Sequence, residues 1–324
     1  MTSWLFRRLL QALFVVLAMT VIVFLGVNVI GNPVDILISP QADQAERARA
    51  IIALGLDRPI WEQYATFLWS AVHGDLGKSF VFNEPALRLI ASRMPATLEL
   101  AVTAVLLSIV LGIPLGLYAG LRPQSLGGRL IMAGSIFGFS LPTFWVGLML
   151  IMVFAVQLGW LPSTGRGQTE TVFGVPWSFL TRDGIAHMVM PATNLALGNI
   201  ALVLRLTRAG VRETLPMDYI KFARAKGLGP ARVLFVHVMK NILIPIVTVI
   251  GLEFGSIIAF AVVTESVFAW PGMGKLIIDS INVLDRPVIV AYLMMIVFLF
   301  IGINLIVDLL YTVLDPRVRL ETRE

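Results

Sequence analysis

The chain has 324 residues, of which 57% are hydrophobic and only 14% are charged, and its mean hydropathy is +0.86. Soluble domains carry charge on about a quarter of their residues, so this composition excludes a soluble globular protein and indicates one that lies in a lipid bilayer. The net charge of +5 does not indicate nucleic-acid binding, because the basic residues stand beside apolar stretches. The absence of cysteine excludes disulfides, thiolate metal sites and a cysteine nucleophile.

Six stretches of the chain meet the length of about 20 mostly apolar residues that a helical span needs. Pro142 is expected to kink the third, and polar residues with Pro191 interrupt the fourth. Strand patterns are scarce, which predicts an all-α integral membrane protein. The six predicted spans are Leu9–Ile30, Leu100–Leu121, Leu130–Leu158, Ile185–Leu204, Asn241–Val263 and Val288–Val307.

The distribution of Lys and Arg predicts how the chain crosses the membrane. If the N-terminus is cytoplasmic, the cytoplasmic segments hold 15 of the 25 basic residues and five of the 20 acids. Cytoplasmic loops carry such an excess, so we expect both termini in the cytoplasm of a bacterial inner-membrane protein. The first span is read as an uncleaved anchor, because its apolar core is too long for a signal peptide and no Ala-x-Ala site follows.

Three regions are predicted along the chain. Residues 1–98 form the anchor span and an external segment, residues 99–315 form a transmembrane domain of five spans, and residues 316–324 form a cytoplasmic tail. The external segment is too large to be a simple turn between two spans.

The cytoplasmic loop at 205–240 is rich in basic residues and contains helix signals. Asp218 is expected to cap a short helix, Gly227 to end it, and Pro230 to start a second helix. Ala223 and Gly227 are four residues apart, which predicts a smooth strip that another surface can approach closely. The alternative interpretation of this loop is contact with anionic lipids, which attract basic residues beside a membrane.

The sequence DYIKFARAKGLGPARVLFVHVMKNILIP at 218–245 resembles the coupling loop of permease subunits in binding-protein-dependent ABC importers. The closest resemblance is to the dipeptide, oligopeptide and nickel branch, although Lys221 and Phe222 replace the Glu-Ala pair of the general motif, and His237 and Lys240 replace its Ile and Pro. The resemblance covers nearly the whole chain. Further segments that fit, in order, are LGLDRP at 54–59, GDLGKS at 74–79, RMPATLEL at 93–100, GFSLPTFWVG at 138–147, LGWLPSTG at 158–165, ESVFAWPGMGKL at 265–276 and NLIVDLLYTVLDPRVR at 304–319.

This resemblance implies a type I ABC importer permease with six transmembrane helices and a coupling loop at about 213–240. It implies four kinds of partner: a second homologous permease, of which this chain resembles the first member, two cytoplasmic ATPases, an external solute-binding protein and membrane lipids. ATP and Mg²⁺ are expected on the ATPases, and no cofactor on this chain. The residues that the resemblance assigns to coupling are Asp218, Tyr219, Ala223, Arg224, Ala225, Lys226 and Gly227.

The chain has no recognisable catalytic or metal-binding motif. Gly77-Lys78-Ser79 and Gly274-Lys275 only approach the nucleotide-binding pattern Gly-x-x-x-x-Gly-Lys-[Ser/Thr]. The three histidines are far apart in the sequence, which disfavours a metal site. We therefore expect no enzymatic activity in this chain. A secondary transporter or channel is the alternative, although no convincing internal repeat supports it.

Four residues are candidates for the translocation path or a gate. Glu253 lies within the fifth span, where an acid is costly, so it either lines the path or makes a structural ion pair or hydrogen bond. Glu265, Phe268 and Trp270 precede a Pro-Gly-Met-Gly turn on the external side. They form an outer gate, a footprint for the binding protein, or only a tight re-entrant turn. The solute stays open among peptides, opines, glutathione, sugars and nickel complexes.

Overall fold

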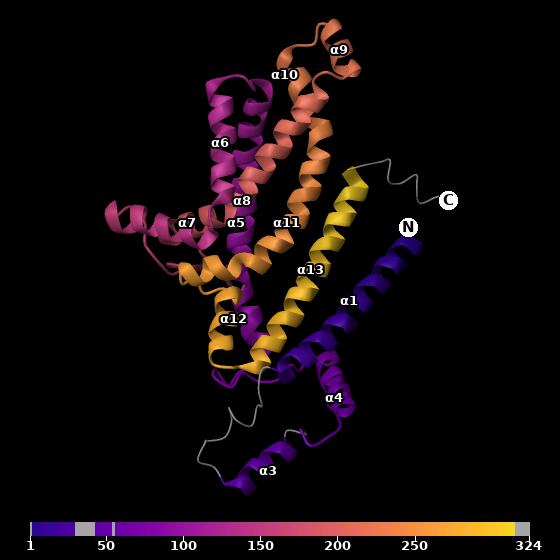
Figure 1. The fold of residues 1–324 in the computed structure, drawn as a ribbon, viewed down its shortest axis with the longest axis vertical. Coiled ribbons are helices and arrows are strands. Elements are labelled where there is room, and N and C mark those ends of the chain that lie inside the picture. Colours follow the sequence, from indigo (N-terminus) through magenta and orange to yellow (C-terminus); the bar gives the residue numbers. More distant parts are fainter. Residues whose placement is uncertain (1, 30–42, 54–55, 315–324) are drawn as a thin grey trace. The chain divides into compact units, whose positions relative to one another are not determined.

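The computed structural model describes residues 2–29, 43–53 and 56–314 (Figure 1), and this part is almost entirely helical. Within these described residues, five helices are long and apolar enough to cross a membrane, and a bent pair makes a sixth if it counts as one span. The elements are α1 (Thr2–Val29), α3 (Gln44–Ala53), α4 (Ile60–Val72), α5 (Ala86–Leu121), α6 (Leu126–Ser140), α7 (Thr143–Leu150), the π-helix η1 (Ile151–Gln157), β1 (Glu170–Val172), β2 (Val175–Trp177), α8 (Arg182–Thr214), α9 (Asp218–Ala225), α10 (Pro230–Arg232), the π-helix η2 (Val233–Val238), α11 (Met239–Val267), α12 (Met273–Asn282) and α13 (Arg286–Leu314).

The third predicted span is not one continuous helix. The axis turns by 106° between α6 and the helix formed by α7 and η1. Leu141 and Pro142 both have extended backbone angles, and Pro142 is the N-cap of α7. Proline lacks the N–H that would continue the helix, and it disfavours a helical conformation in the residue before it. The expected kink at Pro142 is confirmed, and it is sharp enough to divide the predicted span over 130–158 into two helices.

The second predicted span begins much earlier than expected, at Ala86 rather than Leu100. With 36 residues, α5 is about 54 Å long, well beyond the roughly 30 Å of a bilayer's hydrocarbon core. The boundary predicted after residue 98 therefore falls inside a helix. Of the predicted external segment, residues 31–42 and 54–55 lie outside the described residues, as does the predicted tail.

The chain divides into two compact units. The first combines residues 1–94 with 272–302, and the second combines 95–271 with 303–324. In the first unit α1 packs on α4: the Tyr64 hydroxyl lies 2.9 Å from that of Thr20, and the Tyr64 and Phe24 rings pack edge to face with their centres 5.4 Å apart.

Buried Asp285 fixes the loop that precedes α5 in the first unit. Its Oδ2 accepts a 2.5 Å hydrogen bond from the Ser79 hydroxyl, and its Oδ1 accepts one of 3.1 Å from the Phe80 N–H. The Ser79 oxygen in turn accepts the Phe82 N–H at 2.9 Å. The Gly-Lys-Ser sequence that approached a nucleotide-binding motif is thus a turn whose serine binds an aspartate of the same chain.

The second unit depends on very close contact between α5 and α8. Gly112, Gly116 and Gly120 recur every fourth residue of α5, where a Cβ atom would clash with Val203, Thr207 and Val211 of α8 at 2.6–2.9 Å. Small residues allow the backbones of membrane helices to approach, and van der Waals packing then holds them together. α8 also contacts α6, α7 and α11.

Candidate coupling helix and translocation path

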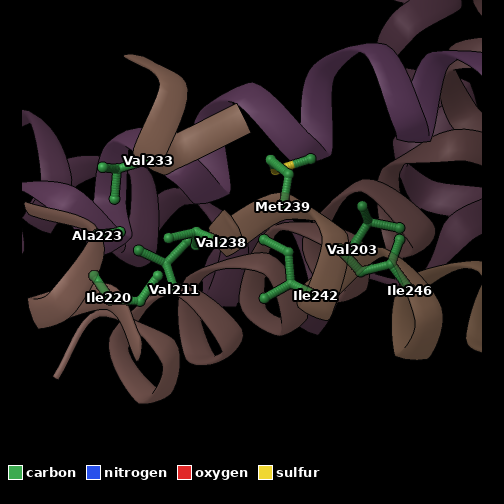
Figure 2. Close-up of a cluster of buried hydrophobic side chains, with 9 residues drawn as sticks. All are labelled: Val203, Val211, Ile220, Ala223, Val233, Val238, Met239, Ile242 and Ile246. Atoms are coloured by element: carbon green, nitrogen blue, oxygen red, sulfur yellow. The ribbon is translucent and has the colours of Figure 1, made fainter. Parts of the chain in front are cut away.

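The short helix α9 packs on the end of α8 and α11 through two apolar residues. Ile220 is fully buried and Ala223 is 5% exposed. Both belong to one apolar cluster (Figure 2), which continues through Val211 and Val238 to Ile246. In Figure 1, α9 lies at the extremity of this helix pair, beyond α10. Because its buried residues continue the core, a force applied to α9 acts on α8 and α11 directly.

Two expectations about α9 are wrong. The N-cap is Met217 without a side-chain hydrogen bond, whereas Asp218 is the first helical residue and pairs with Lys221 at 2.8 Å. Ala223 packs on the chain's own core, so Ala223 and Gly227 do not form a smooth strip for another surface. The spacing of small residues could not distinguish an inward face from an outward one.

The end of α9 is as predicted. Gly227 has φ +75, and its N–H donates to the Arg224 carbonyl at 2.9 Å, while the Leu228 N–H donates to the Ala223 carbonyl at 3.3 Å. These two bonds form the Schellman motif, in which glycine is preferred because it adopts positive φ without strain. Pro230 then begins α10, as expected for proline at the first helical position.

The outer face of α9 combines aromatic and basic side chains. Phe222 is 61% exposed, and the ammonium group of Lys226 lies 4.5 Å from the centre of its ring. Tyr219 is 39% exposed, and its hydroxyl accepts a hydrogen bond from the Asn241 side chain at the start of α11. Arg224 and Ala225, which the sequence also assigned to coupling, are exposed. This face is free within the described part of the chain to meet another protein.

The residues predicted for an outer gate are buried at the other end of the second unit. Trp270 donates through Nε1 to the Ala96 carbonyl at 2.9 Å, and Glu265 accepts a 2.6 Å hydrogen bond from the Thr97 hydroxyl. Phe268 is also buried, and its carbonyl accepts the Gly165 N–H at 2.8 Å. Trp270 and Glu265 thus join the end of α11 to α5, and the Phe268 carbonyl joins it to the connection between η1 and α8. A gating role for them stays a prediction.

Sequence reasoning missed an ion pair beside these residues. Glu99 is buried and its Oε2 accepts hydrogen bonds from Arg166 at 2.8 and 3.2 Å, while its Oε1 accepts the N–H groups of Ser178 and Phe179. The Arg166 guanidinium also lies 5.8 Å from the centre of the Trp270 ring. Glu99 thus fixes the long connection between η1 and α8 onto α5. The only sequence signal was an acid at the edge of an apolar stretch, and this signal does not identify Arg166 as the partner of that acid.

Glu253 lies in α11 and is half-buried. It lines a recess together with Ser108 of α5 and Asn199 of α8. Among the residues that the structure describes, no three His, Cys, Asp or Glu side chains gather closely enough to hold a metal ion.

Comparison with known proteins shows the family. Residues 112–320 match the family described as "Binding-protein-dependent transport system inner membrane component", and residues 1–101 match its N-terminal family. The chain therefore belongs to the membrane components of binding-protein-dependent transport systems, which are permease subunits of ABC importers.

Relatives of known function extend along nearly the whole chain. The chain is 38% identical to the di/tripeptide transport system permease protein DppB of Pseudomonas aeruginosa, over 98% of this chain and 99% of the relative. It is 36% identical to dipeptide permease DppB of Escherichia coli K12 and 38% identical to oligopeptide permease AppB of Bacillus subtilis, with the same coverage.

A solved structure supports the fold. The MetNI methionine ABC transporter in an inward-facing conformation matches with a TM-score of 0.54 at 17% identity, over 72% of this chain and 99% of the matched chain. This likeness confirms the predicted type I importer permease fold.

Proposed function

We propose that this permease carries peptides, or small solutes that resemble them, across the bacterial inner membrane. The support is that the di/tripeptide, dipeptide and oligopeptide permeases named above are 36–38% identical over almost their full length. The binding protein is expected to select the solute, and this chain to provide one wall of the path.

The partners in this proposal are a second homologous permease, two cytoplasmic ATPases that bind ATP and Mg²⁺, and an external solute-binding protein. Both termini are then cytoplasmic, and α9 lies on the cytoplasmic side with the basic residues that favour this orientation. Asp218, Tyr219, Arg224, Ala225 and Lys226 surround Phe222 on the accessible part of α9.

The observation that supports coupling of this permease to ATPases is that α9 has one buried and one exposed side. Ile220 and Ala223 anchor it to the core of α8 and α11, whereas Phe222 and the basic side chains remain exposed. A rigid element with one face in the core and another available to a partner can convert a movement of that partner into a movement of packed helices.

A pull-down from native membranes tests the assembly. The tagged chain is purified in mild detergent and the accompanying proteins are identified by mass spectrometry. We expect a second permease and ATPases with nucleotide-binding motifs to appear together. If the chain is recovered alone or only with itself, a channel or secondary carrier becomes the better interpretation.

Variants of the coupling helix test its role. Gly227→Asp places a side chain at φ +75, and Ala223→Arg places a charge in the core under α9. Both are expected to abolish transport while the chain still inserts into the membrane. Transport at the wild-type rate in both variants would contradict the coupling assignment.

A further inference from the structure

Glu253 places a carboxylate in the middle of a membrane-spanning helix. The apolar helix from Pro230 to Val267 contains it, and it lies 14 residues from either end of α11. In the described part of the chain, neither a hydrogen bond nor an ion pair reaches its carboxylate group. An acid at this depth is costly and faces a bundle interior or a wet cavity rather than lipid.

The recess beside Glu253 lies between α5, α8 and α11 of the second unit. About 10 Å³ of it is open to the centre of a water-sized group, which is about enough for one water molecule, so the recess admits one small polar group but not a large solute. Aliphatic side chains form most of its wall. Its polar members are Ser108, Asn199 and Glu253, each from a different helix.

These three side chains offer hydrogen-bond acceptors. The Ser108 hydroxyl already donates to the Ala104 carbonyl at 2.7 Å, which leaves the lone pairs of its oxygen as acceptors. Asn199 contributes an amide oxygen and Glu253 a carboxylate. An ammonium group has three donors and no acceptor, so its hydrogen-bonding needs complement this set. The aliphatic wall lowers the local dielectric constant, which strengthens the attraction between opposite charges.

We propose that this recess binds the ammonium group of a solute during its passage through the permease. The inference deepens the proposed function and rests on it, because a peptide carries an ammonium group at its N-terminus at neutral pH. A lysine of the second permease would satisfy Glu253 equally well in chemical terms. The solute is favoured because the recess lies between three helices of one unit of this chain and admits only a small group, whereas a lysine of another chain would have to bring its whole side chain between these helices.

The absence of cysteine in the chain allows a direct electrostatic test. Val249 lines the recess one helical turn before Glu253, so Val249→Cys places a thiol beside the carboxylate. The assembled importer is treated with aminoethyl methanethiosulfonate, which is cationic, or sulfonatoethyl methanethiosulfonate, which is anionic, and the labelling rates are measured by mass spectrometry. Glu170→Cys on the exposed strand β1 is the control: it gives the ratio of the cationic to the anionic labelling rate at a site open to solvent.

We expect the ratio of the cationic to the anionic labelling rate to be at least tenfold higher at Val249→Cys than at Glu170→Cys. Adding Glu253→Gln should return the ratio to the surface value. If neither reagent labels Val249→Cys, the recess is closed in the assembly and the proposal is wrong. It is equally wrong if the cationic preference is absent, or persists without Glu253.

Transport measurements distinguish the solute from a lysine of the second permease. In proteoliposomes with the complete importer and loaded binding protein, Glu253→Gln should lower the uptake of dialanine at least tenfold, with unchanged subunit composition and Tm. Glu170→Gln is the matched control and should transport at the wild-type rate. Uptake within twofold of wild type overturns the proposal, as does loss of the second permease. If wild type carries no dialanine but the labelling ratio holds, only the peptide assignment fails.

Discussion

Gly116 of α5 lies so close to Thr207 of α8 that a Cβ atom on the glycine would stand 2.6 Å from the threonine Cβ. The Leu204 carbonyl oxygen would be 2.6 Å from the same atom. Since one obstacle is backbone, a side chain at Gly116 could be accommodated only if the two helices moved apart. The pair of α5 and α8 therefore behaves as one rigid body, on which α9 can act through the core at the end of α8.

Gly116→Ala is expected to lower the stability of the protein by about 1–3 kcal/mol, the usual cost of overpacking a well-packed interior. Gly134→Ala on α6 is the matched control, because a Cβ atom there meets nothing within 4 Å. That control should be neutral or stabilising, since alanine favours a helix over glycine by about 0.5–1 kcal/mol. The Tm of the two variants in detergent tests the difference, and equal Tm values would contradict close packing at Gly116.

Arg166→Met is expected to destabilise the second unit by about 3–5 kcal/mol, because it leaves the buried Glu99 carboxylate without its counter-charge. Adding Glu99→Gln should recover much of this loss, since the glutamine oxygen can still accept the N–H groups of Ser178 and Phe179. A double-mutant cycle of unfolding free energies measures the coupling. If the two losses simply add, the pair does not hold the connection between η1 and α8.

The parts of the fold that follow from local signals were predictable from sequence. Gly227 ends α9 and Pro230 begins α10, because positive φ and a fixed φ near the helical value are properties of these residues themselves. The apolar spans were recognised for the same reason, since length and composition decide which segments can cross a bilayer.

Features that depend on distant partners were not predictable. Ala223 faces inward because Val211 and Val238 lie beneath it, and nothing in the spacing of small residues shows this. The Glu99 carboxylate can be buried because Arg166, 67 residues further along the chain, donates hydrogen bonds to it. The three glycines of α5 are required because α8 packs against them, and the sequence does not show which helix packs there.

Ile220→Ala and Phe222→Ala should separate the anchoring and docking roles of α9. Ile220→Ala empties part of the core and is expected to cost about 2–5 kcal/mol, with a lower Tm for the chain. Phe222→Ala removes an exposed ring and should leave the Tm within error, while it weakens binding of the ATPases. The Tm of the isolated chain and the yield of ATPase in a pull-down measure the two effects.

Met217→Ala is the control for that pair, because it also truncates an exposed apolar side chain beside α9. If both Phe222→Ala and Met217→Ala retain ATPase fully, the outer face of α9 is not the docking surface. A large fall in Tm for Phe222→Ala would instead show that its ring is part of the core.

Asp285→Ala should release the loop that precedes α5. The change removes the acceptor of the Ser79 hydroxyl and of the Phe80 N–H, and each unpaired buried group costs about 1–3 kcal/mol. Lys78 is exposed in the same loop, so trypsin should cleave after it at least tenfold faster in the variant, because cleavage requires local opening of the chain. Asp279→Ala is the matched control, since Asp279 pairs with Lys275 on the exposed surface of α12, where such a pair contributes only about 0.3–0.5 kcal/mol. Equal cleavage rates in the two variants would show that Asp285 does not hold the loop closed.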